Sequence, residues 1–186
     1  MRVYLDTGVF IDFLSVRGNS ILRTTDRRGR TPAVIAADAE RLFEKVGRAH
    51  AGATSCLTYY EAEEALYRPL KESAKGFSHA DRLVIPVARS MTLQVQAMVD
   101  LFTLSVLDLT AATVRLQLQQ LELQTRGIRA ADALHAASAI EFDADLLVST
   151  DRGPAATGWN PDQSPGRRYA LSRHRFGLSS PVASAS

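Results

Sequence analysis

Short apolar segments of strand type alternate along the chain with segments whose apolar residues follow helical spacing. The strand-type segments cover residues 3–5, 53–57, 104–109 and 145–150, and a further short strand is expected near residues 169–171. Parallel strands have to be joined by crossovers, which are usually helices. The alternation therefore predicts an α/β fold in which helices cover a central, mainly parallel sheet.

Helices are expected in the intervals between these strands. We predict them over residues 7–16, 32–50, 58–75, 78–101, 110–127 and 130–142. Pro32 suits a first helical position, where the missing amide hydrogen has no cost. Pro86 is expected to bend or interrupt its helix, because the proline ring clashes with the preceding turn. The polar and basic residues 17–31 are predicted to form a loop insertion.

The length of 186 residues allows one domain with a hydrophobic core and a tail. We assign residues 1–153 to an α/β domain and residues 154–186 to a basic, Pro/Gly/Ser-rich extension that is partly disordered. The net charge is +2, but residues 152–186 hold five arginines against one aspartate, which leaves the rest of the chain slightly acidic. An acidic body with a basic end suits a metal site beside a polyanion.

The sequence also indicates a cellular compartment. Cys56 is the single cysteine, which excludes an intramolecular disulfide and argues against a thiolate zinc site. The first residues reach Asp6 at once and do not read as a signal peptide. No apolar run approaches the roughly 20 residues that cross a bilayer. We therefore expect a cytoplasmic protein with no membrane association.

Four acidic residues lie near the ends of the predicted strands. Asp6 and Asp151 follow the first and fourth strands, and Glu61 lies in the first turn of the helix after the second strand. Asp132 lies in the first turn of the helix before the fourth strand. Ligands of open α/β sheets bind outside the carboxyl ends of the strands. We therefore expect the four carboxylates to meet at one edge.

Such a cluster suits a divalent cation. Ionised carboxylates that lie close together repel one another unless a cation neutralises them. Hard oxygen ligands select Mg²⁺ or Mn²⁺ over Zn²⁺. The ion can polarise a phosphoryl oxygen and lower the pKa of a bound water, so hydrolysis there needs neither a histidine nor a covalent nucleophile.

Each acid also has a purely structural interpretation. Asp6 could cap the helix that follows it, and Asp151 could be a turn residue. Glu61 comes three residues after Thr58, which is the spacing of a capping box. Asp132 is the least ordinary, because its helix is apolar on nearly every side and a buried charge needs a partner.

Four segments of the chain resemble the sequence blocks of PIN domains, in particular those of VapC-type toxins. They are YLDTGVFIDFL, TSCLTYYEAEEALYR, IRAADALHAASAI and DLLVSTD, which occur in that order between residues 2 and 152. The resemblance implies a PIN-like three-layer sandwich over residues 1–153. It also implies that the catalytic and metal-binding acids are Asp6, Glu61, Asp132 and Asp151, with supporting hydroxyl groups from Thr7 and Thr150.

The same resemblance implies an activity and partners. The VapC-type members of that family are Mg²⁺- or Mn²⁺-dependent endoribonucleases. They are usually toxins paired with an antitoxin, and many form homodimers. Candidate RNA contacts are Arg27, Arg28, Arg167 and Arg168, although a merely solvated loop explains the first two equally well. The chain departs from the family in two respects: no aromatic residue follows Asp151 closely, and the segment 17–31 and the tail exceed a minimal PIN domain.

Two other functions share features with this sequence. Haloacid-dehalogenase-type phosphohydrolases also begin with an aspartate at a strand end, but they need a second acid two residues later, where this chain has Gly8. A non-catalytic PIN-fold module that binds RNA or protein is the other alternative, and the retention of all four acids gives it no support. His135 is expected to be a core histidine bonded to the backbone or to a carboxylate, not a general base.

Overall fold

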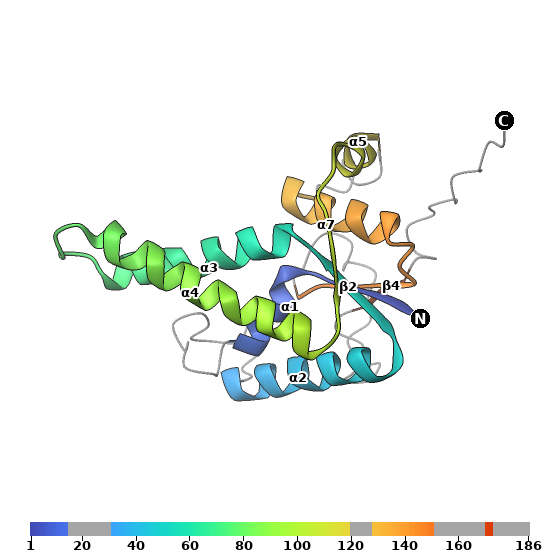
Figure 1. Ribbon diagram of the computed structural model, residues 1–186, viewed down its shortest axis with the longest axis horizontal. Coiled ribbons are helices and arrows are strands. Elements are labelled where there is room, and N and C mark those ends of the chain that lie inside the picture. Colours follow the sequence, from blue (N-terminus) through green and yellow to red (C-terminus); the bar gives the residue numbers. More distant parts are fainter. Residues whose placement is uncertain (15–30, 120–127, 151–169, 173–186) are drawn as a thin grey trace.

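The computed structural model describes residues 1–14, 31–119, 128–150 and 170–172 (Figure 1). In chain order, the elements are β1 (Arg2–Leu5), α1 (Thr7–Leu14), α2 (Pro32–Ala49), β2 (Ala51–Ser55), α3 (Leu57–Ser73), α4 (Ala80–Leu101), β3 (Ser105–Leu107), α5 (Ala111–Gln119), α7 (Ala130–Glu141), β4 (Leu146–Val148) and β5 (Ala170–Ser172). Strands and helices alternate over most of this order, as the apolar pattern predicts. The predicted insertion over residues 17–31 lies almost entirely outside the described residues.

The five strands form one sheet in the order β3-β2-β1-β4-β5. Strands β1 to β4 run parallel, and β5 is antiparallel to β4. Tyr4 in the central strand β1 pairs with Ala53 of β2 on one side and with Leu147 of β4 on the other. The predicted α/β fold with a central, mainly parallel sheet is confirmed.

Helices cover both faces of this sheet (Figure 1). Successive side chains of a strand point to opposite faces, and β1 shows this alternation. Val3 and Leu5 belong to the large core that α1, α2 and α4 build, whereas Tyr4 packs with Ala139 of α7. The sheet therefore lies between two helical layers, as predicted for a three-layer sandwich.

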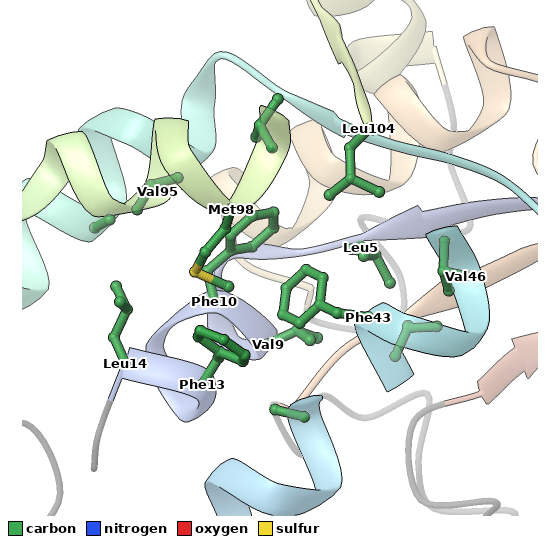
Figure 2. Packing of buried hydrophobic residues seen from close by; sticks show 14 of the residues in the cluster. Leu5, Val9, Phe10, Phe13, Leu14, Phe43, Val46, Val95, Met98 and Leu104 are labelled. Carbon is green, nitrogen blue, oxygen red and sulfur yellow. The ribbon is translucent and has the colours of Figure 1, made fainter. Parts of the chain in front are cut away.

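Contacts between aromatic rings pack α1 against the neighbouring helix α2. Phe43 of α2 contacts Phe10 edge-on at a centroid distance of 5.0 Å (Figure 2). It also stacks on Phe102 at a centroid distance of 5.0 Å. Phe13 contacts both Phe43 and Phe102 edge-on. Ring pairs of this kind contribute about 0.5–1.5 kcal/mol beyond the area they bury. They fix the first turn of α1, and with it the residues that directly follow β1.

One prediction about a helix was wrong in part. Pro86 lies inside α4, which continues without interruption from Ala80 to Leu101. A proline in a helix leaves the carbonyl four residues earlier without its amide donor. Here Pro86 and Arg82 are both exposed, so water can satisfy that carbonyl.

Of the helices that the structure describes, none is both long enough and apolar enough to span a membrane.

Candidate active site

Asp6 stands where β1 passes into α1, between the carboxyl ends of β1 and β4. Its amide donates to the carbonyl of Val148 at 3.0 Å, and its Oδ1 accepts a hydrogen bond from the amide of Gly8 at 2.8 Å. The second bond is the one that a helix-capping aspartate makes. Asp6 therefore caps α1 through Oδ1, as its structural interpretation predicted. This bond also fixes the orientation of the whole carboxylate at the edge of the sheet.

Gly8 allows Asp6 and Thr150 to approach each other. A Cβ atom at position 8 would lie 1.9 Å from Thr150 Oγ1 and 3.2 Å from Asp6 Oδ1. Thr150 follows β4, and its hydroxyl oxygen is buried and makes no hydrogen bond within the part of the chain that the structure describes. A buried hydroxyl without a partner beside a carboxylate is a place where a ligand can supply the missing interaction.

Glu61 turns away from the start of its own helix. Its Oε2 accepts a short hydrogen bond from the hydroxyl of Thr7 and lies 2.8 Å from His135 Nε2. The hydroxyl of Thr58 lies 2.7 Å from that of Thr54 instead. Glu61 therefore joins the residue after Asp6 to α7, and the capping-box interpretation of Thr58 and Glu61 does not describe its contacts.

The surroundings of Glu61 favour its ionised form. Its side chain keeps 24% of its exposure, and this partial burial raises the pKa. Hydrogen bonds from His135 and Thr7, together with the charge interaction with His135, act in the opposite direction, and the pKa of Glu61 is lowered overall. The carboxylate is therefore negative at neutral pH and can only accept hydrogen bonds.

His135 is a buried residue with both ring nitrogens engaged. It is 4% exposed, and its Nδ1 lies 2.8 Å from the hydroxyl of Tyr4, which is fully buried in β1. Burial raises the pKa of the Tyr4 hydroxyl, which therefore keeps its proton. The expectation of a core histidine bonded to a carboxylate is confirmed. The role of Tyr4 was missed, although a tyrosine inside an apolar strand two positions before Asp6 was a signal for it.

The remaining predicted site residues fall into two groups. Asp132 lies in the first turn of α7, half-buried and engaged in further interactions, three residues before His135. Residues three apart neighbour each other on a helix, so Asp132 lies beside the residue that contacts Glu61. The others lie outside the described residues, and they are Asp151, Arg27, Arg28, Arg167 and Arg168.

The oxygen atoms at this edge are ligands of the type that a divalent cation prefers. Carboxylate and hydroxyl oxygens from Asp6 and Thr150 are hard ligands, and the unpartnered hydroxyl of Thr150 agrees with a bound ligand beside Asp6. Among the described residues, however, no group of three or more His, Cys, Asp or Glu side chains is arranged to hold a metal ion. The fourth predicted acid, Asp151, lies outside them.

Comparison with known proteins finds likeness in fold. No protein-family model matches the chain, and no similar sequence was found among curated proteins. A chain of the VapBC2 structure from Rickettsia felis, solved with a DNA fragment from its promoter, shares 17% identity, with 81% of this chain and 88% of that chain covered and a TM-score of 0.46. VapC20 from Mycobacterium tuberculosis, described as a toxin that cleaves the sarcin-ricin loop, shares 17% identity, with 85% and 96% covered and a TM-score of 0.48.

The likeness to both structures is one of overall fold. At 17% identity it concerns the fold alone, and it assigns neither an activity nor a partner to this chain.

Proposed function

We propose that this chain is a metal-dependent endoribonuclease of the PIN-domain type and the toxin of a toxin–antitoxin pair. One observation supports this most. Thr7 from the first sequence block, Glu61 from the second and His135 from the third make mutual hydrogen bonds at the carboxyl edge of the sheet. Three of the four blocks that resemble PIN domains thus meet at one point, although the chain separates them widely.

Asp6, Glu61, Asp132 and Asp151 are the proposed acidic set. These four carboxylates would hold Mg²⁺ or Mn²⁺, which when bound would polarise a phosphoryl oxygen and lower the pKa of a water. The capping bond from Gly8 orients the carboxylate of Asp6. The ionised carboxylate of Glu61 can accept a hydrogen bond from a water at this edge, and Thr7 and His135 fix where it does so.

The substrate and partners follow from the same proposal. RNA would lie with its phosphates along the acidic edge, and its backbone charge would be met by the basic residues Arg27, Arg28, Arg167 and Arg168. An antitoxin protein would cover the site, a second copy of the chain would complete a homodimer, and the protein would act in the cytoplasm.

The experiment that tests this function compares three reactions of the purified chain. RNA should be cut in the presence of Mg²⁺ or Mn²⁺, left intact in excess EDTA, and cut again when the metal is restored. A small phosphate monoester should not be hydrolysed under the same conditions. Undiminished cleavage in EDTA would contradict the metal dependence, and RNA binding without any cleavage would favour the non-catalytic module.

A further inference from the structure

Two exposed side chains lie next to the acidic residues at the carboxyl edge of the sheet. One is Tyr60, in the first turn of α3 and directly before Glu61. The other is Arg129, the N-cap residue of α7, three positions before Asp132. Helices α3 and α7 begin close together at this edge (Figure 1), where Glu61 contacts His135. A ligand of the candidate site therefore has both side chains beside it.

The two neighbouring tyrosines of α3 differ in their surroundings. Tyr59 packs against the main core, and its hydroxyl donates to Gln96 at 2.7 Å. Tyr60 is 65% exposed, and no described residue makes a hydrogen bond or a ring contact with it. An exposed ring forgoes the free energy that its burial would supply. The ring of Tyr60 thus adds no packing to the described fold and is accessible to a ligand.

Arg129 occupies a position where an arginine does not stabilise a helix. N-cap side chains usually accept a hydrogen bond from the first amides, but a guanidinium group has no acceptor, and that of Arg129 makes no capping bond. A positive charge at this end also opposes the helix dipole. The side chain is exposed and forms no ion pair with the described residues, whereas Arg89 pairs with Glu63 at 3.2 Å. Residues that break a local rule of stability occur at functional sites.

We propose that Tyr60 stacks on an unpaired base of the RNA and that Arg129 binds a phosphate of the same strand. This inference rests on the proposed function for its ligand, and it adds that the RNA is single-stranded where it crosses the acidic edge. A base inside a duplex is stacked on its neighbours and paired, so an unpaired base is the one that can offer its face to an aromatic ring.

The charges at this edge explain the need for a cation beside the metal. The carboxylates of the acidic set repel RNA phosphates wherever a bound metal ion does not neutralise them. A guanidinium group can bind one phosphate through two parallel N–H groups. Arg129 lies six positions before His135, about 9 Å along a helix axis, and therefore suits a phosphate next to the one at the carboxylates. With a base on Tyr60, the strand is then held at two points.

Binding of RNA without cleavage tests both contacts. The full chain is titrated at several salt concentrations with a short single-stranded RNA of mixed sequence, in Ca²⁺, whose looser shell holds water and phosphate too weakly for efficient cleavage. We expect Tyr60→Ala to weaken binding about 5- to 150-fold without a change in salt dependence, and Tyr60→Phe to bind almost as the wild type does. Arg129→Gln should lower the slope of log affinity against log salt by about 0.7.

Matched controls come from the far end of the α3–α4 hairpin, away from the sheet (Figure 1). Phe77→Ala removes a ring that is 67% exposed, and Arg82→Gln removes an exposed arginine from the first turn of α4. Neither should change the affinity or its salt dependence. An RNA duplex of the same sequence should bind equally to the wild type and to Tyr60→Ala, because it offers no unpaired base.

The outcomes separate the two contacts from each other and from the proposed function. Wild-type affinity of Tyr60→Ala, or an equal loss in Tyr60→Phe, would overturn the stacking contact. An unchanged slope in Arg129→Gln would overturn the phosphate contact. A wild type that binds this RNA but cuts none in Mg²⁺ or Mn²⁺ would remove the proposed function alone, whereas a wild type that binds no RNA would remove both.

Discussion

His135 Nε2 lies 2.8 Å from Glu61 Oε2, although 74 positions separate the two residues in the sequence. The contact joins α7 to α3 across the carboxyl end of β1, where Thr7 completes it. Helix α3, which follows β2, and helix α7, which precedes β4, are thus tied to the residue next to Asp6. The predictions below concern the groups around this junction.

Asp6→Asn and Asp132→Asn should each remove nearly all ribonuclease activity while the fold survives. Asparagine keeps a carbonyl oxygen at position 6 that can accept the bond from Gly8, but it lacks the charge that a metal ligand needs. Cleavage assays and thermal melts of the two variants check this, with the exposed Asp108→Asn as a control. Full activity of either site variant in a preparation free of other nucleases would contradict the proposed metal site.

Gly8→Ala should destabilise the protein in spite of its better helix propensity. Alanine in a helix is favoured over glycine by about 1 kcal/mol, but its Cβ would lie 1.9 Å from Thr150 Oγ1. Overpacking of this kind typically costs 1–3 kcal/mol, so a small net loss in the free energy of unfolding is expected. Adding Thr150→Ala should recover part of it. Denaturant melts that rank Gly8→Ala above the wild type would show that Thr150 is easily displaced.

Glu61→Gln should change how stability depends on pH. The pKa of Glu61 is lowered in the folded state, so its ionisation stabilises the fold above the unfolded-state pKa of about 4.3 and ceases to do so as the pH falls through the folded-state value. We expect the variant to be about 1–2 kcal/mol less stable at pH 7, with the difference shrinking below about pH 4. Urea melts at several pH values measure it. Glu72→Gln, which loses only an exposed pair with Lys75, should show almost no difference.

The basic tail should contribute to the salt dependence of RNA binding. If Arg167 and Arg168 contact phosphates, replacing both with glutamine should lower the slope of log affinity against log salt by about 0.7 for each lost contact. Titrations of a single-stranded RNA at several salt concentrations give that slope. A slope equal to that of the wild type would place these arginines in another role, such as contact with a protein partner.

Much of the fold could be predicted because it depends on local pattern. The apolar runs of β1 and β4 are visible in the sequence, and so is Pro32 at the start of α2. Strand ends were less certain: β2 occupies Ala51–Ser55, two residues before the predicted segment. Alanine, glycine and serine have little strand preference of their own, so the pairing of this segment with β1 and β3 decides its limits.

The contacts within the candidate site were not predictable to the same degree. Asp6 and Glu61 could be singled out because acids after strands form a recognisable pattern, but nothing local shows that Glu61 turns to His135. That contact depends on how α3 and α7 pack around β1. The hydrogen bond of Tyr4 could not be predicted for a similar reason. Its neighbours in sequence are apolar, and its partner His135 comes from α7, which packs on one face of the sheet.

The pairing of β1 with β4 has a consequence for how the protein is made. Val3 pairs with Leu146. The central strand β1 therefore gains this neighbour only after the ribosome has synthesised β4, near the end of the described domain. Contacts between such distant segments form late, because closing a long loop costs entropy before any contact repays it. A nascent chain that stops before β4 would lack one neighbour of its central strand and the support for Asp6 from Val148. Under the proposed function, unfinished copies should therefore lack ribonuclease activity.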